Sequence, residues 1–138
     1  MMQPLLLDTC AVIWMGENDA LSDAAVSALD SAADRSEQVA ISPISAWEIG
    51  MLASKGRFAS PIPPGQWFAR FVSGGNYRLP SLSPDVLIGS SFLPGKPPND
   101  PIDRIIIATA RDNGLTLITR DRAIIDYGAA GHVNVIEC

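Results

Sequence analysis

Cysteine and histidine are scarce in this chain of 138 residues, which contains only Cys10, Cys138 and His132. Two cysteines near opposite ends provide no disulfide framework, and with one histidine they lack the spacing of a zinc site. The start, MMQPLLLDTC, lacks the basic segment and long apolar stretch of a signal peptide. No apolar run approaches the length that spans a bilayer. These absences predict a protein of the reducing cytoplasm, without a membrane partner.

Positive charge is also scarce, with 10 Lys and Arg against 15 Asp and Glu, a net charge of −5 and a pI near 4.6. This balance argues against a classical basic nucleic-acid binder. It does not exclude an enzyme that meets phosphate through a bound cation, because the metal then supplies the positive charge. Hydrophobic residues make up 47% and charged residues 18% of the chain, which is typical of a globular protein. The length predicts one domain, residues 1–138.

Short apolar runs alternate with helical patterns along the chain. The runs predict strands at 5–7, 39–41, 77–79, 115–118 and 133–136. Capping residues and breakers predict helices from an N-cap at Ser22 to about residue 33, and over 45–55, 67–71, 84–92, 101–113 and 122–126. The strands are continuously apolar, as in a buried parallel sheet. The sequence therefore predicts an α/β domain with a mainly parallel central sheet flanked by α-helices.

Acidic residues fall where the predicted strands end and the predicted helices begin. Asp8 and Asp121 follow strands, Glu48 and Asp103 lie in the first turns of helices, and Asp100 precedes the second of these helices. Helices in such a domain run antiparallel to the strands, so strand ends and helix starts share one edge of the sheet. Ligands bind at that edge in open α/β folds. We therefore expect these carboxylates to gather there.

Most of these acids also have a structural interpretation. Ser45 and Glu48 have the spacing of a capping box. Asp100 fits a helix N-cap, and Asp103 then occupies the third helical position, where the helix dipole favours a negative charge by roughly 0.3–1 kcal/mol. Asp121 fits the N-cap of the short helix that follows it. Taken singly, each of these interpretations is adequate.

Asp8 is harder to explain, because a carboxylate at the end of a buried strand is costly without a partner. Taken together, carboxylates roughly 4–6 Å apart repel and raise one another's pKa. Four arginines could offset part of this repulsion, namely Arg104, Arg111, Arg120 and Arg122. A bound Mg²⁺ or Mn²⁺ does so more simply, because these ions prefer oxygen ligands. The pattern therefore indicates metal-assisted hydrolysis of a phosphodiester.

Three segments carry a family resemblance: LLLDTCAVIW, SPISAWEIGML and DPIDRIIIATARDNGLTLITRD. They resemble the PIN-domain ribonucleases and, among these, are most similar to the VapC toxins of bacterial toxin–antitoxin pairs. The segments occur in the family's order and the resemblance covers essentially the whole chain. The long third segment is the most specific of the three.

The resemblance implies an acidic metal pocket. In that family a strand-end Asp, a helix Glu, a helix-start Asp and an Asp after the T-x-D strand form the pocket, and the matching positions are Asp8, Glu48, Asp103 and Asp121. The family further implies a five-stranded parallel sheet flanked by helices, dependence on Mg²⁺ or Mn²⁺, and cleavage of RNA. It also implies a homodimer and a cognate antitoxin protein that blocks the pocket.

Several neighbouring residues qualify as supporting members of the pocket. Thr9 and Thr119 lie beside pocket acids and are expected to hydrogen-bond them or a water, and the family also has a hydroxyl residue at position 119. Asp100 and Asp126 are additional acids whose membership the sequence leaves open.

Two other functions compete with this hypothesis. An aspartyl-phosphate hydrolase would use Asp8 as its nucleophile, but such enzymes usually carry a second Asp two residues later, where this chain has Cys10. A non-catalytic RNA- or protein-binding module of the same fold would show no metal-dependent nuclease activity and no thermal stabilisation by Mn²⁺. Trp14, Trp47 and Trp67 could stack on RNA bases, although aromatic residues at helical spacing are more often core or interface residues.

Overall fold

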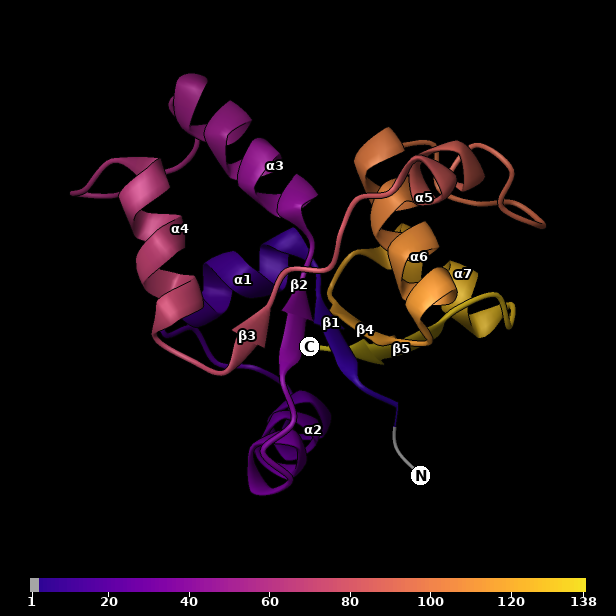
Figure 1. Cartoon of the computed structure of the whole chain (residues 1–138), viewed down its shortest axis with the longest axis horizontal. Helices are drawn as coiled ribbons and strands as arrows, with labels where there is room; N and C mark the ends of the chain where they lie inside the picture. Colours follow the sequence, from indigo (N-terminus) through magenta and orange to yellow (C-terminus); the bar gives the residue numbers. More distant parts are fainter. Residues whose placement is uncertain (1–2) are drawn as a thin grey trace.

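The computed structural model describes residues 3–138, which form five strands and seven helices (Figure 1). In chain order these are β1 (Leu5–Leu7), α1 (Thr9–Gly16), α2 (Asp23–Asp34), β2 (Val39–Ile41), α3 (Pro43–Ser54), α4 (Pro64–Ser73), β3 (Tyr77–Arg78), α5 (Pro84–Gly89), α6 (Pro101–Asn113), β4 (Thr116–Thr119), α7 (Arg122–Ala129) and β5 (Asn134–Glu137). Within residues 3–138, no helix is both long and apolar enough to cross a membrane.

The five strands form one sheet in the order β3-β2-β1-β4-β5, and every neighbouring pair is parallel. The central strand is β1, where Leu6 lies beside Ala40 of β2 on one side and Leu117 of β4 on the other. The chain leaves β1 toward β2 and later returns to β4 on the opposite side. The strand order therefore reverses between β1 and β4, which is where open α/β sheets bind their ligands. The predicted five-stranded parallel sheet is confirmed.

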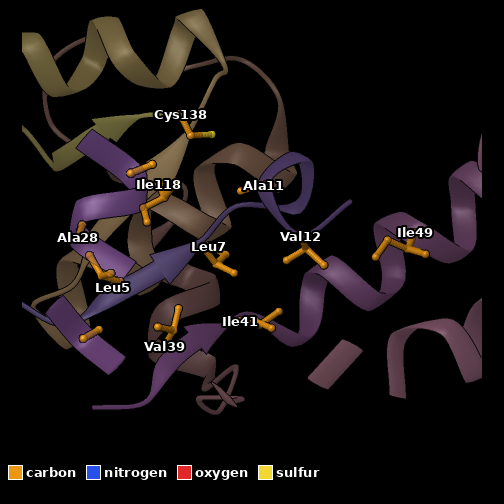
Figure 2. Close-up of a cluster of buried hydrophobic side chains, with 12 residues drawn as sticks. Leu5, Leu7, Ala11, Val12, Ala28, Val39, Ile41, Ile49, Ile118 and Cys138 are labelled. Atoms are coloured by element: carbon orange, nitrogen blue, oxygen red, sulfur yellow. The ribbon is translucent and has the colours of Figure 1, made fainter. Parts of the chain in front are cut away.

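The alternating side chains of β1 divide the core into two layers. Leu5 and Leu7 face a cluster that includes Ala11 and Val12 of α1 together with buried alanines of α2. Figure 2 shows this cluster around β1. Leu6 faces the opposite cluster, which is built mainly from α6 and α7. Both faces of the sheet are covered, so the short strands are continuously apolar, as the sequence predicted.

Two helix starts differ from the prediction. Helix α1 was not predicted, because its sequence, TCAVIWMG, is almost uniformly apolar and lacks an amphipathic period. Helix α3 begins at Pro43, with Ser42 as N-cap accepting a hydrogen bond from the Ile44 amide. The predicted capping box of Ser45 and Glu48 is therefore wrong, and Glu48 lies in the second turn. Proline suits the first helical position, since it lacks an amide hydrogen that would go unused there.

The remaining boundaries differ by a few residues. Helix α5 ends at Gly89 instead of residue 92, and the Ser90 hydroxyl donates to the Leu87 carbonyl (2.6 Å) just beyond that end. Such local hydrogen bonds compete with continuation of a helix. Helices α4 and α7 are longer than predicted, and β4 and β5 are shifted by one residue toward the C-terminus.

Candidate functional site

The predicted pocket acids come from four separate elements at the carboxyl edge of the sheet. Asp8 follows β1 and is the N-cap of α1, while Asp121 follows β4 and is the N-cap of α7. Asp103 is the third residue of α6, and Glu48 lies in α3. Asp8 and Asp121 thus flank the point where the strand order reverses. In Figure 1 this edge lies at the tips of the central arrows, between the starts of α3 and α6.

Asp8 is held by hydrogen bonds at the centre of this edge. Its side chain is 5% exposed and accepts from the Cys10 amide (2.6 Å) and from the Thr119 hydroxyl. The same Thr119 oxygen accepts from the Asp121 amide (3.0 Å). Thr119 therefore joins two of the acids, which confirms the prediction that it hydrogen-bonds a neighbouring carboxylate. These bonds stabilise a buried carboxylate that is otherwise costly.

Asp100 and Asp103 have different environments although they are three residues apart. The Asp100 carboxylate accepts from the Ile102 amide (2.7 Å) and the Asp103 amide (3.4 Å), so it is the N-cap that the sequence predicted. Asp103 is partly buried, and its first-turn position is also as predicted. Asp121 likewise caps α7 through the Ile124 amide (3.1 Å). Capping and proximity to other acids are therefore compatible at this edge.

Glu48 is reached by a hydroxyl from another helix. The Thr9 and Ser45 hydroxyls lie 2.9 Å apart, and both side chains are buried. The Thr9 hydroxyl also hydrogen-bonds Glu48 and so lowers its pKa. The prediction that Thr9 hydrogen-bonds a pocket acid is thus met at Glu48. Sequence reasoning missed this role of Ser45, although its spacing of three residues from Glu48 on one helix was a usable signal.

Burial and mutual repulsion raise the pKa of three of the acids. Burial is the largest cause at Asp8, where the Asp121 charge adds to it and the hydrogen bonds oppose it. At Glu48, burial raises the pKa, and the charges of Asp8, Asp100 and Asp121 raise it further. Burial and the same kind of repulsion raise the pKa of Asp103 from 3.8 to about 7. The acids are therefore close enough to destabilise one another's charged forms.

Arginines do not offset this repulsion through ion pairs. Within residues 3–138 none of the four pocket acids forms a salt bridge, which contradicts the expected offset. Arg104 donates to the Pro98 carbonyl (2.5 Å), Arg111 donates to the His132 carbonyl, and Arg122 pairs with Glu137. Arg120 donates to the Ala20 carbonyl and stacks over the Trp14 ring at 3.8 Å.

The donor set suits a hard divalent cation, because it consists of carboxylates whose charges repel. In the described part of the chain, however, no three His, Cys, Asp or Glu side chains are already grouped to hold an ion. Chelation by Asp8, Glu48, Asp103 and Asp121 therefore requires side-chain movement toward a common point. Asp126, whose membership was open, is exposed in α7 and is not among the charges that raise these pKa values.

The remaining candidates have other environments. Burial, followed by the Asp8 charge, raises the pKa of the Cys10 thiol, which opposes formation of a nucleophilic thiolate. Trp14 lies under Arg120, and Trp67 packs between Phe58 and Phe71. Only Trp47 among the three tryptophans is largely exposed.

Comparison with known proteins gives matches along most of the chain. Residues 5–130 match the PIN domain. Ribonuclease VapC22 of Mycobacterium tuberculosis is 34% identical over 124 residues, which cover 89% of this chain and 91% of that protein. The crystal structure of VapBC2 from Rickettsia felis, bound to a promoter DNA fragment, superposes with a TM-score of 0.68 at 17% identity, covering 97% and 98% of the two chains. FitAcB from Neisseria gonorrhoeae gives a TM-score of 0.58 at 21% identity, covering 96% of each. These two structural likenesses concern the fold.

Proposed function

Because the chain belongs to the PIN-domain family, we propose that it is a Mg²⁺- or Mn²⁺-dependent endoribonuclease that acts as the toxin of a toxin–antitoxin pair. The observation that carries the proposal is the convergence of Asp8, Glu48, Asp103 and Asp121 from four elements, with burial and repulsion raising the pKa of three of them. Its relative VapC22 is a ribonuclease, which supports RNA as the substrate.

The four acids would hold the divalent ion and are the proposed catalytic group. A bound ion supplies a water of lowered pKa and a positive charge for the phosphate. Thr119 keeps the Asp8 carboxylate oriented and links it to the Asp121 backbone. Asp100 fixes the first turn of α6 and thereby the position of Asp103. The thiol of Cys10 stays protonated and takes no part as a nucleophile.

The proposed partners are RNA, a cognate antitoxin and a second copy of the chain. The antitoxin is supported by the fold shared with toxin–antitoxin complexes such as VapBC2 and FitAcB. Self-association is supported by large apolar side chains left exposed, including Trp47 (55%), Ile88 (63%) and Phe92 (80%). A monomeric mass by light scattering at micromolar concentration would contradict it. The two free cysteines fit a reducing, cytoplasmic setting.

RNA cleavage by the purified protein tests the proposed activity. We expect cleavage with Mn²⁺ or Mg²⁺, loss of cleavage in EDTA, and a loss of about 100-fold or more in Asp8→Asn and Asp103→Asn. The matched control is Asp112→Asn, which changes an exposed aspartate at the other end of α6 and should cleave like the wild type. Undiminished activity in both pocket variants would overturn the proposal. Sequencing of the new 5′ ends would identify the RNA target.

The competing interpretation is a non-catalytic RNA- or protein-binding module of the same fold. The raised pKa values disfavour it, because a binding module gains nothing from carboxylates that destabilise one another's charged forms. Cleavage that is absent with either metal, while RNA is still bound, would favour the binding module.

A further inference from the structure

Two buried hydroxyls connect the helices that carry Asp8 and Glu48. Thr9 is the first residue of α1, immediately after Asp8, and Ser45 lies three residues before Glu48 in α3. Their oxygens are 2.9 Å apart, and the side chains are 4% and 0% exposed. A serine inside a helix commonly bonds a carbonyl of its own preceding turn. Here Ser45 instead bonds across to another helix.

The donor and acceptor roles in this pair follow from Glu48. An ionised carboxylate only accepts hydrogen bonds, so Thr9 must donate its single hydroxyl hydrogen to Glu48. Thr9 can then only accept from Ser45. The three side chains thus form a directed chain from Ser45 through Thr9 to Glu48. Since a hydroxyl has one hydrogen, this order fixes the rotamer of Thr9 as well as the direction of its bond.

Apolar packing already holds the two helices together. Val12 of α1 and Ile49 of α3 are buried in the same cluster, as Figure 2 shows. Ile49 is the residue after Glu48, so the backbone of α3 is anchored beside Glu48 without the hydroxyls. Removing a hydroxyl should therefore leave the helices in place and free the Glu48 side chain.

We propose that Thr9 and Ser45 are positioning residues that hold the Glu48 side chain toward Asp8, in the arrangement in which both bind the divalent ion. This inference rests on the proposed function, and it assigns to the pair a role through Glu48 instead of direct contact with the ion. Hydroxyls that orient metal ligands typically matter by 10–100-fold in metal affinity or activity when removed.

Mn²⁺ binding by hydroxyl variants tests the inference, with affinity measured by electron paramagnetic resonance of free Mn²⁺ and cleavage measured in parallel. Thr9→Val keeps the shape of the side chain and removes the hydroxyl, and it should weaken Mn²⁺ binding by roughly 10-fold or more. Thr9→Ser restores the hydroxyl and should bind Mn²⁺ nearly as tightly as the wild type. Ser45→Ala should weaken binding less than Thr9→Val, because Ser45 acts through Thr9.

The matched control is Thr109→Val in α6, which also removes a fully buried hydroxyl, one that donates to the Ile105 carbonyl within its own helix. It should leave Mn²⁺ affinity unchanged. Wild-type affinity in Thr9→Val, or equal losses in Thr9→Val and Thr109→Val, would overturn the inference and leave the proposed function standing. A wild-type protein that neither binds Mn²⁺ nor cleaves RNA would overturn both. If Thr9→Val fails to fold, Ser45→Ala with wild-type affinity would still overturn it.

Discussion

The two edges of the sheet treat their polar side chains differently. At the amino edge, Gln3 accepts from the Thr116 hydroxyl (3.2 Å) and from the Asn134 amide (2.6 Å), so neutral groups satisfy one another. At the carboxyl edge, buried carboxylates raise one another's pKa. The first arrangement contributes to stability, and the second costs stability unless a cation is added.

Positive charge is distributed against the need of the acids. Arg111 bonds the His132 carbonyl at the amino edge, where both line a hollow of about 320 Å³. Arg120 lies next to Asp121 in sequence but stacks on Trp14. The chain therefore has arginines close to the acids in sequence and uses them for carbonyls and an aromatic ring. This difference indicates that the carboxyl edge is built to receive a cation from solution.

The largest expected effect is stabilisation by metal, which acts at one edge alone. With free Mn²⁺ at 100 times its dissociation constant, the wild type should gain about 2.7 kcal/mol. For a chain of this length that corresponds to a rise in Tm of roughly 5–10 °C. Asp103→Asn should show a much smaller rise in differential scanning fluorimetry. An equal rise in both proteins would place the ion elsewhere.

The next effect compares two threonines of the same strand. Thr119→Val leaves the buried Asp8 oxygen and the Asp121 amide without their partner, which should cost about 1–3 kcal/mol in the free energy of unfolding. Thr116→Val removes one exposed hydrogen bond at the amino edge and should cost about 0.5–1.5 kcal/mol at most. Urea unfolding measures both. A larger loss for Thr116→Val would reverse the proposed difference between the edges.

The smallest effect separates Asp100 from Asp103 in EDTA. The pKa of Asp103 is raised from 3.8 to about 7, so the native state binds its proton more tightly than the unfolded state does. Stability should therefore fall as pH rises from about 4 to about 7, and Asp103→Asn should lose this dependence. At pH 8 Asp103→Asn should be at least as stable as the wild type.

Asp100→Ala is the matched comparison for that measurement, because it removes the N-cap and should cost about 0.5–2 kcal/mol. A similar cost for Asp103→Asn at pH 8 would mean that Asp103 only supports the helix.

Much of the fold was predictable because the elements carry their own signals. The buried strand of residues 5–7 and the N-caps Ser22, Ser83 and Asp100 were predicted from local sequence and are confirmed. Helix α1 was not, because an apolar helix buried on several sides has no amphipathic period. The start of α3 was misplaced because Ser42 and Ser45 both resemble N-caps, and only the fold buries Ser45 against Thr9.

The sequence by itself determined which acids stand at strand ends and helix starts, because those positions depend on local periodicity and capping. It also determined the parallel sheet, through continuously apolar strands separated by helices. Only the tertiary structure decided which groups the acids meet. The arginines next to them in sequence turned to other partners, and hydroxyls from Thr9 and Thr119, distant in sequence, reached Glu48 and Asp8. Side-chain partners depend on how helices pack across the sheet, and local sequence does not encode that packing.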